Sequence, residues 1–320
     1  MLVTNAENEF RVRKERGEHP LVIKMSLIIL TEKDKKSFEE TMKFFPGNKL
    51  AFGILHDAIT NGEKVMPFVG AGISAFAYKT WNELLRYLAE YLEVKDMMNV
   101  KILLDDGKYM EAAQYICSSM GQTLFDKSLR SLYSEDKIND DDLKKNAAFY
   151  IPLICGGNCI TTNYDRVIEH ACMLNSVAYD MAGINDTYKL NTYFRNPNKR
   201  GLIFKLHGDI LSNNNDILLS EKSYATHYQL GSPLRKHLEK WIGGRQFLFI
   251  GASLLKDKTI NVLVDELEEG MLNYVIYGCS GSEIHKLKQR FDEMGMIPIF
   301  YDSRDHSSLT SILKYLVYDK

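Results

Sequence analysis

The chain has 320 residues, and its 40 Lys and Arg residues nearly balance its 42 Asp and Glu residues, giving a formal net charge of −2. Hydrophobic residues make up 45% of the chain and charged residues 26%, which is ordinary for a globular protein. This near-neutral balance argues against a broad electrostatic grip on a polyanion, so we expect no direct binding of nucleic acid. The length allows one large domain or two smaller ones.

Cysteine usage and hydropathy bear on metal binding and on the cellular compartment. The five cysteines include only one close pair, Cys155 and Cys159, with three residues between them, whereas a zinc ribbon needs two close pairs. We therefore expect buried, unpaired cysteines and no metal site. No segment reaches the ~18–20 apolar residues of a membrane span, and the apolar run at 21–30 is interrupted by Lys24. These patterns favour a cytoplasmic protein without membrane contact.

The chain begins with a charge-rich stretch, residues 1–48, which we interpret as an N-terminal extension. A strand is predicted at Leu27–Leu30 and a helix around Lys35–Phe44, and the turn signal Pro46-Gly47-Asn48 closes the segment. Residues 49–320 are predicted to form the main domain.

The main domain opens with a predicted helix at Phe52–Thr60 and a buried strand at Val65–Val69. Apolar residues then recur at helical spacing, beginning with Trp81, Leu84, Leu85, Leu88 and Tyr91. We predict an α-helical insertion at about residues 81–148, placed after the first strand.

Short strands and helices alternate through the rest of the chain. The predicted strands are Asn158–Thr162, Leu202–Leu206, Ile217–Leu219, Gln246–Ile250, Tyr274–Tyr277 and Ile297–Tyr301. The predicted helices are Tyr164–Met173, Ser223–Trp241, Thr259–Glu269, a helix around Ile284–Met294 and a last helix from Ser308. This alternation predicts an α/β fold, a Rossmann-like parallel sheet with helices on both faces.

A glycine motif, Gly70-Ala71-Gly72-Ile73-Ser74-Ala75, follows the first strand and fits the pattern G-x-G-x-x-[G/A]. In such motifs the glycines allow a tight turn and a close approach to a pyrophosphate, whose charge meets the start of a helix. A plain glycine turn is the alternative interpretation. The acidic residue that dehydrogenases carry ~20 residues later is missing, because Glu90 falls within a helical pattern.

Three further motifs lie where predicted strands end, the edge at which parallel sheets bind ligands. Thr161-Thr162-Asn163-Tyr164-Asp165 is the first, although Asn163 or Asp165 could simply cap a helix. Lys205-Leu206-His207-Gly208-Asp209 places a histidine where it could act as a base, although a lone histidine is more often structural. Phe249-Ile250-Gly251-Ala252-Ser253 offers a glycine and a serine to a ribose or phosphate.

Taken together, the four motifs resemble those of the sirtuin family. The matching stretches are GAGIS at Gly70–Ser74, TTNYD at Thr161–Asp165, LHG at Leu206–Gly208 and GAS at Gly251–Ser253. The resemblance covers residues from about 48 to 302. Within the family, the chain is more similar to the bacterial sirtuin-like NAD hydrolases of antiphage defence, of the Thoeris effector N-terminal domain type, than to the protein deacetylases. Three longer stretches carry that likeness: Thr161–Ala171, Phe204–Ile210 and Phe247–Ser253.

Two departures from the deacetylases support this closer likeness. The four-cysteine zinc module of the deacetylases is absent, and Ala75–Trp81 replaces their Pro-Asp-Phe-Arg type of stretch. Without a zinc module, the cleft that holds an acyl-lysine peptide has no obvious counterpart. The resemblance therefore favours a catalytic domain that hydrolyses NAD over one that removes acyl groups.

The resemblance implies NAD as a substrate that is cleaved to nicotinamide and ADP-ribose, with no metal. It makes His207 and Asn163 the catalytic residues, with His207 accepting a proton and Asn163 holding the nicotinamide ribose. Asp165 would contact the carboxamide, while the glycine motif would hold the pyrophosphate and Gly251 with Ser253 would border the adenosine ribose. The implied NAD-binding residues are Gly70, Ala71, Gly72, Ser74, Thr162, Asp165, Gly251 and Ser253.

Other functions remain open at this point. The same site could transfer ADP-ribose to an acyl group or a protein side chain, as an NAD-dependent deacylase or ADP-ribosyltransferase. A non-catalytic module that senses NAD or ADP-ribose is a further alternative. The family likeness also implies an abortive-infection effector held in check as a homo-oligomer or by a partner such as an ATPase, an Argonaute or another defence component.

Overall fold

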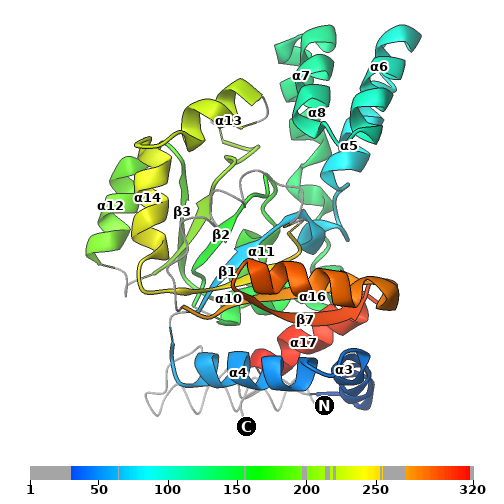
Figure 1. The fold of residues 1–320 in the computed structure, drawn as a ribbon. Coiled ribbons are helices and arrows are strands. Elements are labelled where there is room, and N and C mark those ends of the chain that lie inside the picture. Colours follow the sequence, from blue (N-terminus) through cyan, green and yellow to red (C-terminus); the bar gives the residue numbers. More distant parts are fainter. Residues whose placement is uncertain are drawn as a thin grey trace.

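The computed structural model describes residues 30–63, 65–154, 156–196, 200–212, 217–218, 221–252, 254 and 271–317. Seven parallel strands form one sheet in the order β3-β4-β2-β1-β5-β6-β7 (Figure 1). The strands are β1 Val65–Val69, β2 Cys159–Thr161, β3 Tyr179–Gly183, β4 Gly201–Lys205, β5 Gln246–Ile250, β6 Asn273–Cys279 and β7 Met296–Asp302. The predicted α/β fold with a parallel sheet is confirmed.

The strand order places a topological switch point at β1. From β1 the chain builds one half of the sheet through β2, β3 and β4, and it then returns to the other side of β1 to form β5. Connections that leave a sheet in opposite directions open a crevice at the carboxyl ends of the central strands. The four motifs lie at the ends of β1, β2, β4 and β5, so the topology brings them to this crevice.

Alternate side chains of the strands point to opposite faces, and each face carries its own helices. Helices α10 Ile151–Ile154, α11 Val167–Leu174 and α17 Ser307–Val317 share a core with Ile203 and Leu248 of the sheet. Helices α12 Thr187–Arg195, α14 Pro233–Ile242 and α16 Ile284–Glu293 share the other core with Phe204 and Phe249. Helices therefore cover both faces, as predicted.

Before the sheet, helices α3 Glu32–Phe44 and α4 Asn48–Thr60 pack beside α17 (Figure 1). The Phe38 ring stacks on Tyr315 with 3.9 Å between ring centroids, and Lys314 Nζ lies 2.6 Å from Asp34 Oδ2. Both predicted helices in this region are confirmed, and α4 begins four residues before its predicted start. The predicted strand at Leu27–Leu30 lies almost wholly outside the described residues.

The helical insertion follows β1, and its helices α5 to α8 rise away from the sheet edge (Figure 1). The insertion comprises α5 Trp81–Ala89, α6 Val94–Asp105, α7 Tyr109–Met120, α8 Gln122–Leu132 and α9 Asp140–Lys144, with short 3-10 turns. Leu84, Leu85 and Leu88 are buried, as their spacing predicts. Tyr91 is 64% exposed because α5 ends at Ala89, so it does not belong to the buried stripe.

The predicted helix Ser223–Trp241 is wrong in one respect, since two helices, α13 Glu221–Tyr228 and α14, occupy this region. Gly231 adopts a φ of +77°, which favours glycine, and the Ser232 side chain caps α14 by accepting a hydrogen bond from the Arg235 N–H. Pro233 then opens α14, a position at which its missing N–H costs nothing. These three residues together end one helix and start the next.

Other predictions fail at the edge of the sheet or lie outside the described residues. Residues 217 and 218 of the predicted strand Ile217–Leu219 are not in a strand, and 219 is outside the described residues. Strand β3 and helix α12 were not predicted, because β3 is a half-exposed edge strand that carries Asp180 and Gly183. The predicted helix Thr259–Glu269 also lies outside the described residues.

None of the cysteines in the described part of the chain forms a disulfide, and Cys159, Cys172 and Cys279 are buried as expected. Cys117 is only half-buried, and Cys155 is not described. Within the described ranges, no cluster of three or more His, Cys, Asp or Glu side chains could hold a metal ion. None of the described helices is both long and apolar enough to cross a membrane.

Candidate functional site

A cavity of about 600 Å³ lies at the carboxyl ends of β1, β2, β4 and β5. Nearly all the residues predicted for the site line it, and they come from four separate stretches of the chain. They are Gly70, Ala71, Gly72, Ser74, Thr162, Asn163, Asp165, His207 and Gly251. The remaining predicted residue, Ser253, lies outside the described residues. We use the term sheet-edge wall for this side of the cavity, meaning residues 70–74, 162–165, 207 and 251–252.

The structure gives the glycine motif a packing role, which its predicted contact with a pyrophosphate does not include. It opens a four-residue 3-10 helix, Ala71–Ser74, and not a long α-helix, so a helix dipole gives little support for phosphate binding. A Cβ on Gly70 would lie 2.4 Å from Ala252 Cα, and one on Gly72 would lie 3.0 Å from the Gly251 carbonyl oxygen. The Gly72 N–H already donates to that oxygen over 2.9 Å. The glycines therefore let the loops after β1 and β5 pack against each other.

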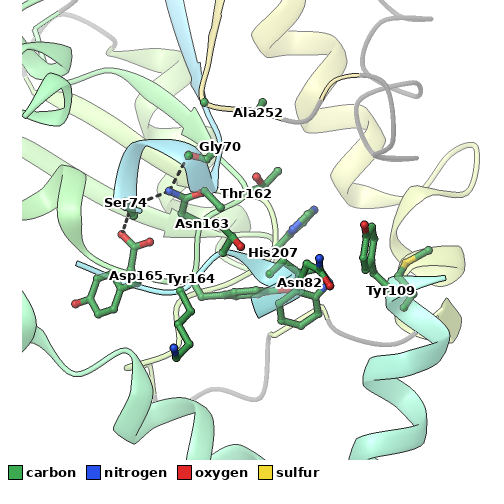
Figure 2. A pocket seen from close by; sticks show the side chains of 18 of the residues that line it. Gly70, Ser74, Asn82, Tyr109, Thr162, Asn163, Tyr164, Asp165, His207 and Ala252 are labelled. Atoms are coloured by element: carbon green, nitrogen blue, oxygen red, sulfur yellow. Dashed lines mark hydrogen bonds between the residues drawn. The ribbon is translucent and has the colours of Figure 1, made fainter. Parts of the chain in front are cut away.

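Asn163 sits at the centre of a buried hydrogen-bond network (Figure 2). Its Nδ2 donates to the Gly70 carbonyl oxygen over 3.2 Å and to Ser74 Oγ over 3.1 Å. These bonds fix the amide plane, so that Oδ1 is left buried with no partner among the described residues. Helix α11 begins only at Val167, so the alternative that Asn163 caps a helix is wrong. A buried unpaired acceptor is costly, and a ligand donor could satisfy it.

Asp165 lines the cavity, and its side chain is buried beside Ser74. Its Oδ1 accepts hydrogen bonds from Ser74 Oγ and from the Val167 N–H, each over 3.0 Å. The bond to Val167 ties the carboxylate to the first turn of α11, so the capping alternative is partly right for this residue. Burial raises the pKa of Asp165, and the nearby positive charge of Lys205 only partly offsets that effect.

His207 follows β4 in a turn that Gly208 completes with a φ of +88°. The His207 ring is almost fully buried, and the Tyr224 hydroxyl lies 3.1 Å from its Nδ1 and 3.3 Å from its Nε2. The centroid of the Tyr164 ring lies 6.2 Å from the centroid of the imidazole. The imidazole is thus positioned by aromatic neighbours, and its ring nitrogens can donate or accept a hydrogen bond.

Sequence reasoning missed Tyr224 because a tyrosine within a helical pattern carries no mark of function. It also missed the opposite side of the cavity, which the insertion supplies. We use the term insertion wall for Trp81, Asn82 and residues 107–111, at the start of α5 and between α6 and α7. Tyr109 projects toward the cavity from the first turn of α7 (Figure 2). No periodic pattern indicates which end of an amphipathic helix will meet a cavity.

The arrangement combines a buried amide acceptor, an imidazole and several aromatic rings around a space of ligand size. Tyr78, Trp81, Tyr133, Tyr164 and Tyr224 all line the cavity, and such faces can stack on the rings of a nucleotide. Lys79 and Lys108 are the cationic side chains among its described lining residues. The site can therefore bind an aromatic, phosphate-bearing ligand and move a proton beside it.

Comparison with known protein families gives one match. Residues 157–299 match the family model described as SIR2-like domain, a span that runs from β2 into β7 and holds the TTNYD, LHG and GAS motifs. No curated protein matches the chain. SIR2-like domains are typically NAD-utilising enzymes. The match over residues 157–299 supports a place for this chain among the sirtuin-like proteins, with a function related to NAD.

Proposed function

We propose that this protein is an NAD glycohydrolase, which cleaves the bond between nicotinamide and ribose to give nicotinamide and ADP-ribose. The observation that carries the proposal is the convergence of nine predicted residues from four stretches on one cavity. Within that cavity, the unpaired Oδ1 of Asn163 and the ring of His207 offer an acceptor and a base. These groups fit the hydroxyl-rich ribose of NAD.

Hydrolysis of NAD requires few groups of the protein besides an acceptor and a base. Nicotinamide is a cation in NAD and leaves as a neutral molecule, so the main need is to stabilise an oxocarbenium-like ribose and to deliver water. Asn163 Oδ1 would accept a hydrogen bond from a ribose hydroxyl or from the attacking water. His207 would accept a proton from the same group, a contribution worth roughly 10²–10⁴-fold in rate. Tyr224 would hold the imidazole in place.

Hydrolysis is favoured over transfer to an acyl-lysine peptide. In the sequence, Cys155 and Cys159 are the only closely spaced cysteines, so the four-cysteine module that accompanies deacylation has no counterpart. The insertion wall lines the same cavity as Asn163 and His207. Water would then be the acceptor that reaches the ribose.

In a cell, such an enzyme would deplete NAD, which fits an antiphage-defence effector that acts by abortive infection. Its activity would need restraint, through a homo-oligomer or a regulatory partner protein. Helix α6 supports that part of the proposal, because Val94, Met98 and Ile102 recur every four residues along it and are 70%, 60% and 60% exposed. Light scattering of the purified protein tests self-association, and a monomer with full activity would contradict it.

The experiment that tests the activity mixes purified protein with NAD and follows nicotinamide by chromatography in three arms. The arms contain no acceptor, an acylated peptide or an unmodified protein acceptor. Nicotinamide and ADP-ribose released in equal amounts without acceptor support the proposal. Release only with a peptide or protein acceptor would indicate a transferase. Binding of NAD without any release would indicate a sensing module and would overturn the proposal.

A further inference from the structure

A cluster of buried charges lies directly beneath the sheet-edge wall, and the proposed chemistry does not use it. Lys205, the last residue of β4, is completely buried, and its Nζ lies 3.0 Å from Oε1 of the buried Glu169 on α11. An isolated buried ammonium is very costly, so this position requires compensating partners. The identity of those partners indicates what the lysine does.

The ammonium of Lys205 holds the backbone of the TTNYD segment. Its Nζ donates to the carbonyl oxygen of Asp165, and the carbonyl oxygen of Tyr164 lies 3.4 Å away. These two carbonyls directly follow Asn163 in the chain. Thr161, at the start of the segment, pairs with Lys205 across the β2–β4 ladder, and its carbonyl oxygen accepts the Leu206 N–H over 2.9 Å. The side chain of Lys205 and the backbone N–H of the next residue, Leu206, thus hold the two ends of this loop.

The same charge cluster also holds the loop that carries His207. Asp209 Oδ1 lies 3.8 Å from Lys205 Nζ, and Arg166 binds the Asp209 carboxylate with Nη2 at 2.7 Å and Nε at 3.1 Å. The Ile210 N–H donates to the Tyr164 carbonyl oxygen over 3.2 Å. Residues 163–166 and 207–210 are therefore fastened to each other, and both are fastened to Lys205.

A further ion pair links this cluster to the insertion. Arg166 Nη1 donates to Glu135 Oε1 over 3.0 Å, and Glu135 lies in the 3-10 turn Glu135–Lys137 between α8 and α9. Arg166 is only partly buried, so this pair is weaker than the buried one. The cluster therefore connects the two catalytic loops to each other and to the helices that face them.

We propose that Lys205, together with Glu169, Asp209 and Arg166, is a positioning device that sets the distance between Asn163 and His207. This inference rests on the proposed NAD hydrolysis, for which those two side chains must meet one ribose. Lys205 touches no substrate in this scheme. It acts by holding the carbonyls of one loop and the carboxylate of the other, so its loss misplaces both groups without emptying the cavity.

The test separates positioning from general stability with three variants. Lys205→Met leaves Glu169 buried without its partner, while Lys205→Met combined with Glu169→Gln removes both charges. Lys314→Met is the matched control, because it breaks a largely buried ion pair with Asp34, between α17 and α3, and neither residue lines the cavity. We expect the double variant to regain much of the thermal stability that Lys205→Met loses.

Across these three variants, thermal stability and kcat should change independently of each other. Because a misplacement of about 1 Å can cost 10²-fold in rate, we expect kcat for nicotinamide release to fall about 100-fold in both Lys205 variants, with KM for NAD little changed. Lys314→Met should melt earlier yet keep the kcat of the unmodified protein. A double variant that regains both stability and kcat would show a purely structural role and overturn the inference.

A second readout does not depend on catalysis. Hydrogen exchange of the ligand-free protein should be faster at residues 161–169 and 205–212 in the double variant, and unchanged in α16. Unchanged exchange in both loops would also overturn the inference. If the unmodified protein releases no nicotinamide, the proposed function fails, while this exchange measurement still tests whether Lys205 fastens the two loops.

Discussion

The two walls of the cavity differ in how firmly their polar groups are held. On the sheet-edge wall, Asn163, Ser74 and Asp165 are buried and hydrogen-bonded to one another. On the insertion wall, Tyr109 is only half-buried and Lys108 and Glu111 are exposed. A rigid, dry array suits the stabilisation of charge during a reaction, because its dipoles need no reorganisation. The more exposed wall suits recognition of the substrate.

This contrast implies that the two walls have different roles, which mutagenesis can test. Changes on the sheet-edge wall should reduce kcat or the stability of the fold. Changes on the insertion wall should mainly raise KM.

The largest effect is expected for His207→Ala. Loss of the imidazole removes the proposed base, so kcat for nicotinamide release should fall roughly 10²–10⁴-fold, with the fold intact. His170→Ala is the control, because His170 pairs with Asp140 of α9 and does not line the cavity. Steady-state kinetics and circular dichroism check both variants. Full turnover by His207→Ala would remove His207 from the mechanism.

Gly70→Ala tests the packing of the loops after β1 and β5. Its Cβ would meet Ala252 Cα at 2.4 Å and the Gly251 oxygen at 2.5 Å, both in the backbone, so the loops must separate. We expect a loss of about 1–3 kcal/mol in the free energy of unfolding, together with most of the activity. Gly53→Ala, in α4, meets no atom within 4 Å and should stabilise the protein by about 0.5–1 kcal/mol. Urea titrations compare the two, and equal effects would contradict the close approach.

Asp209→Asn tests the charge cluster through pH. Burial alone would raise the pKa of Asp209, but the charge of Lys205 and the hydrogen bonds from Arg166 outweigh it and hold the pKa below 3.8. A lowered folded-state pKa adds stability above the unfolded value of about 3.9, and this stability is lost as pH falls through the folded value. Asp209→Asn should therefore cost about 1–3 kcal/mol at pH 7, and this cost should shrink as pH falls below the unfolded value.

Urea titrations between pH 7 and pH 3 give both free energies for this comparison. Asp105→Asn is the control on the insertion, where Asp105 pairs with Arg86 at an exposed surface. That variant should change the free energy of unfolding by no more than about 1 kcal/mol. A difference between Asp209→Asn and the unmodified protein that stays constant with pH would contradict the ion pairing of Asp209.

The smallest effect is expected on the insertion wall. Tyr109→Ala removes a ring that faces the cavity, so KM for NAD should rise by about 5–10-fold, or roughly 1 kcal/mol, with kcat little changed. Tyr91→Ala is the control, because Tyr91 belongs to the same insertion but is 64% exposed and does not line the cavity. A fall in kcat without a rise in KM for Tyr109→Ala would show that both walls take part in the reaction.

The sequence predicted the parts of the molecule that depend on local pattern. Buried strands such as β5 form continuous apolar runs, and the motifs at their ends are contiguous, so residues such as Asn163 and His207 could be found. Strand β3 escaped prediction because an edge strand needs little apolar surface. Tyr224 and Tyr109 escaped because their roles depend on which distant elements pack together, which no local pattern encodes.

The backbone contacts of the glycine motif also could not be predicted from the sequence. The spacing predicted a tight turn and a close approach to a pyrophosphate, and the structure adds the contact of Gly70 and Gly72 with the backbone of Gly251 and Ala252. Contacts between residues nearly 180 positions apart can be read only from the fold. The same holds for Lys205, whose place in a motif gave no sign that it holds the neighbouring loop.

In the proposed complex, NAD lies between the two walls with its reacting ribose at Asn163 and His207. A crystal structure of the protein with bound ADP-ribose tests this most directly. We expect a ribose hydroxyl within hydrogen-bond distance of Asn163 Oδ1 and of the His207 ring, with Tyr109 against the ligand. ADP-ribose bound elsewhere, or bound with both side chains out of reach of the ribose, would contradict it.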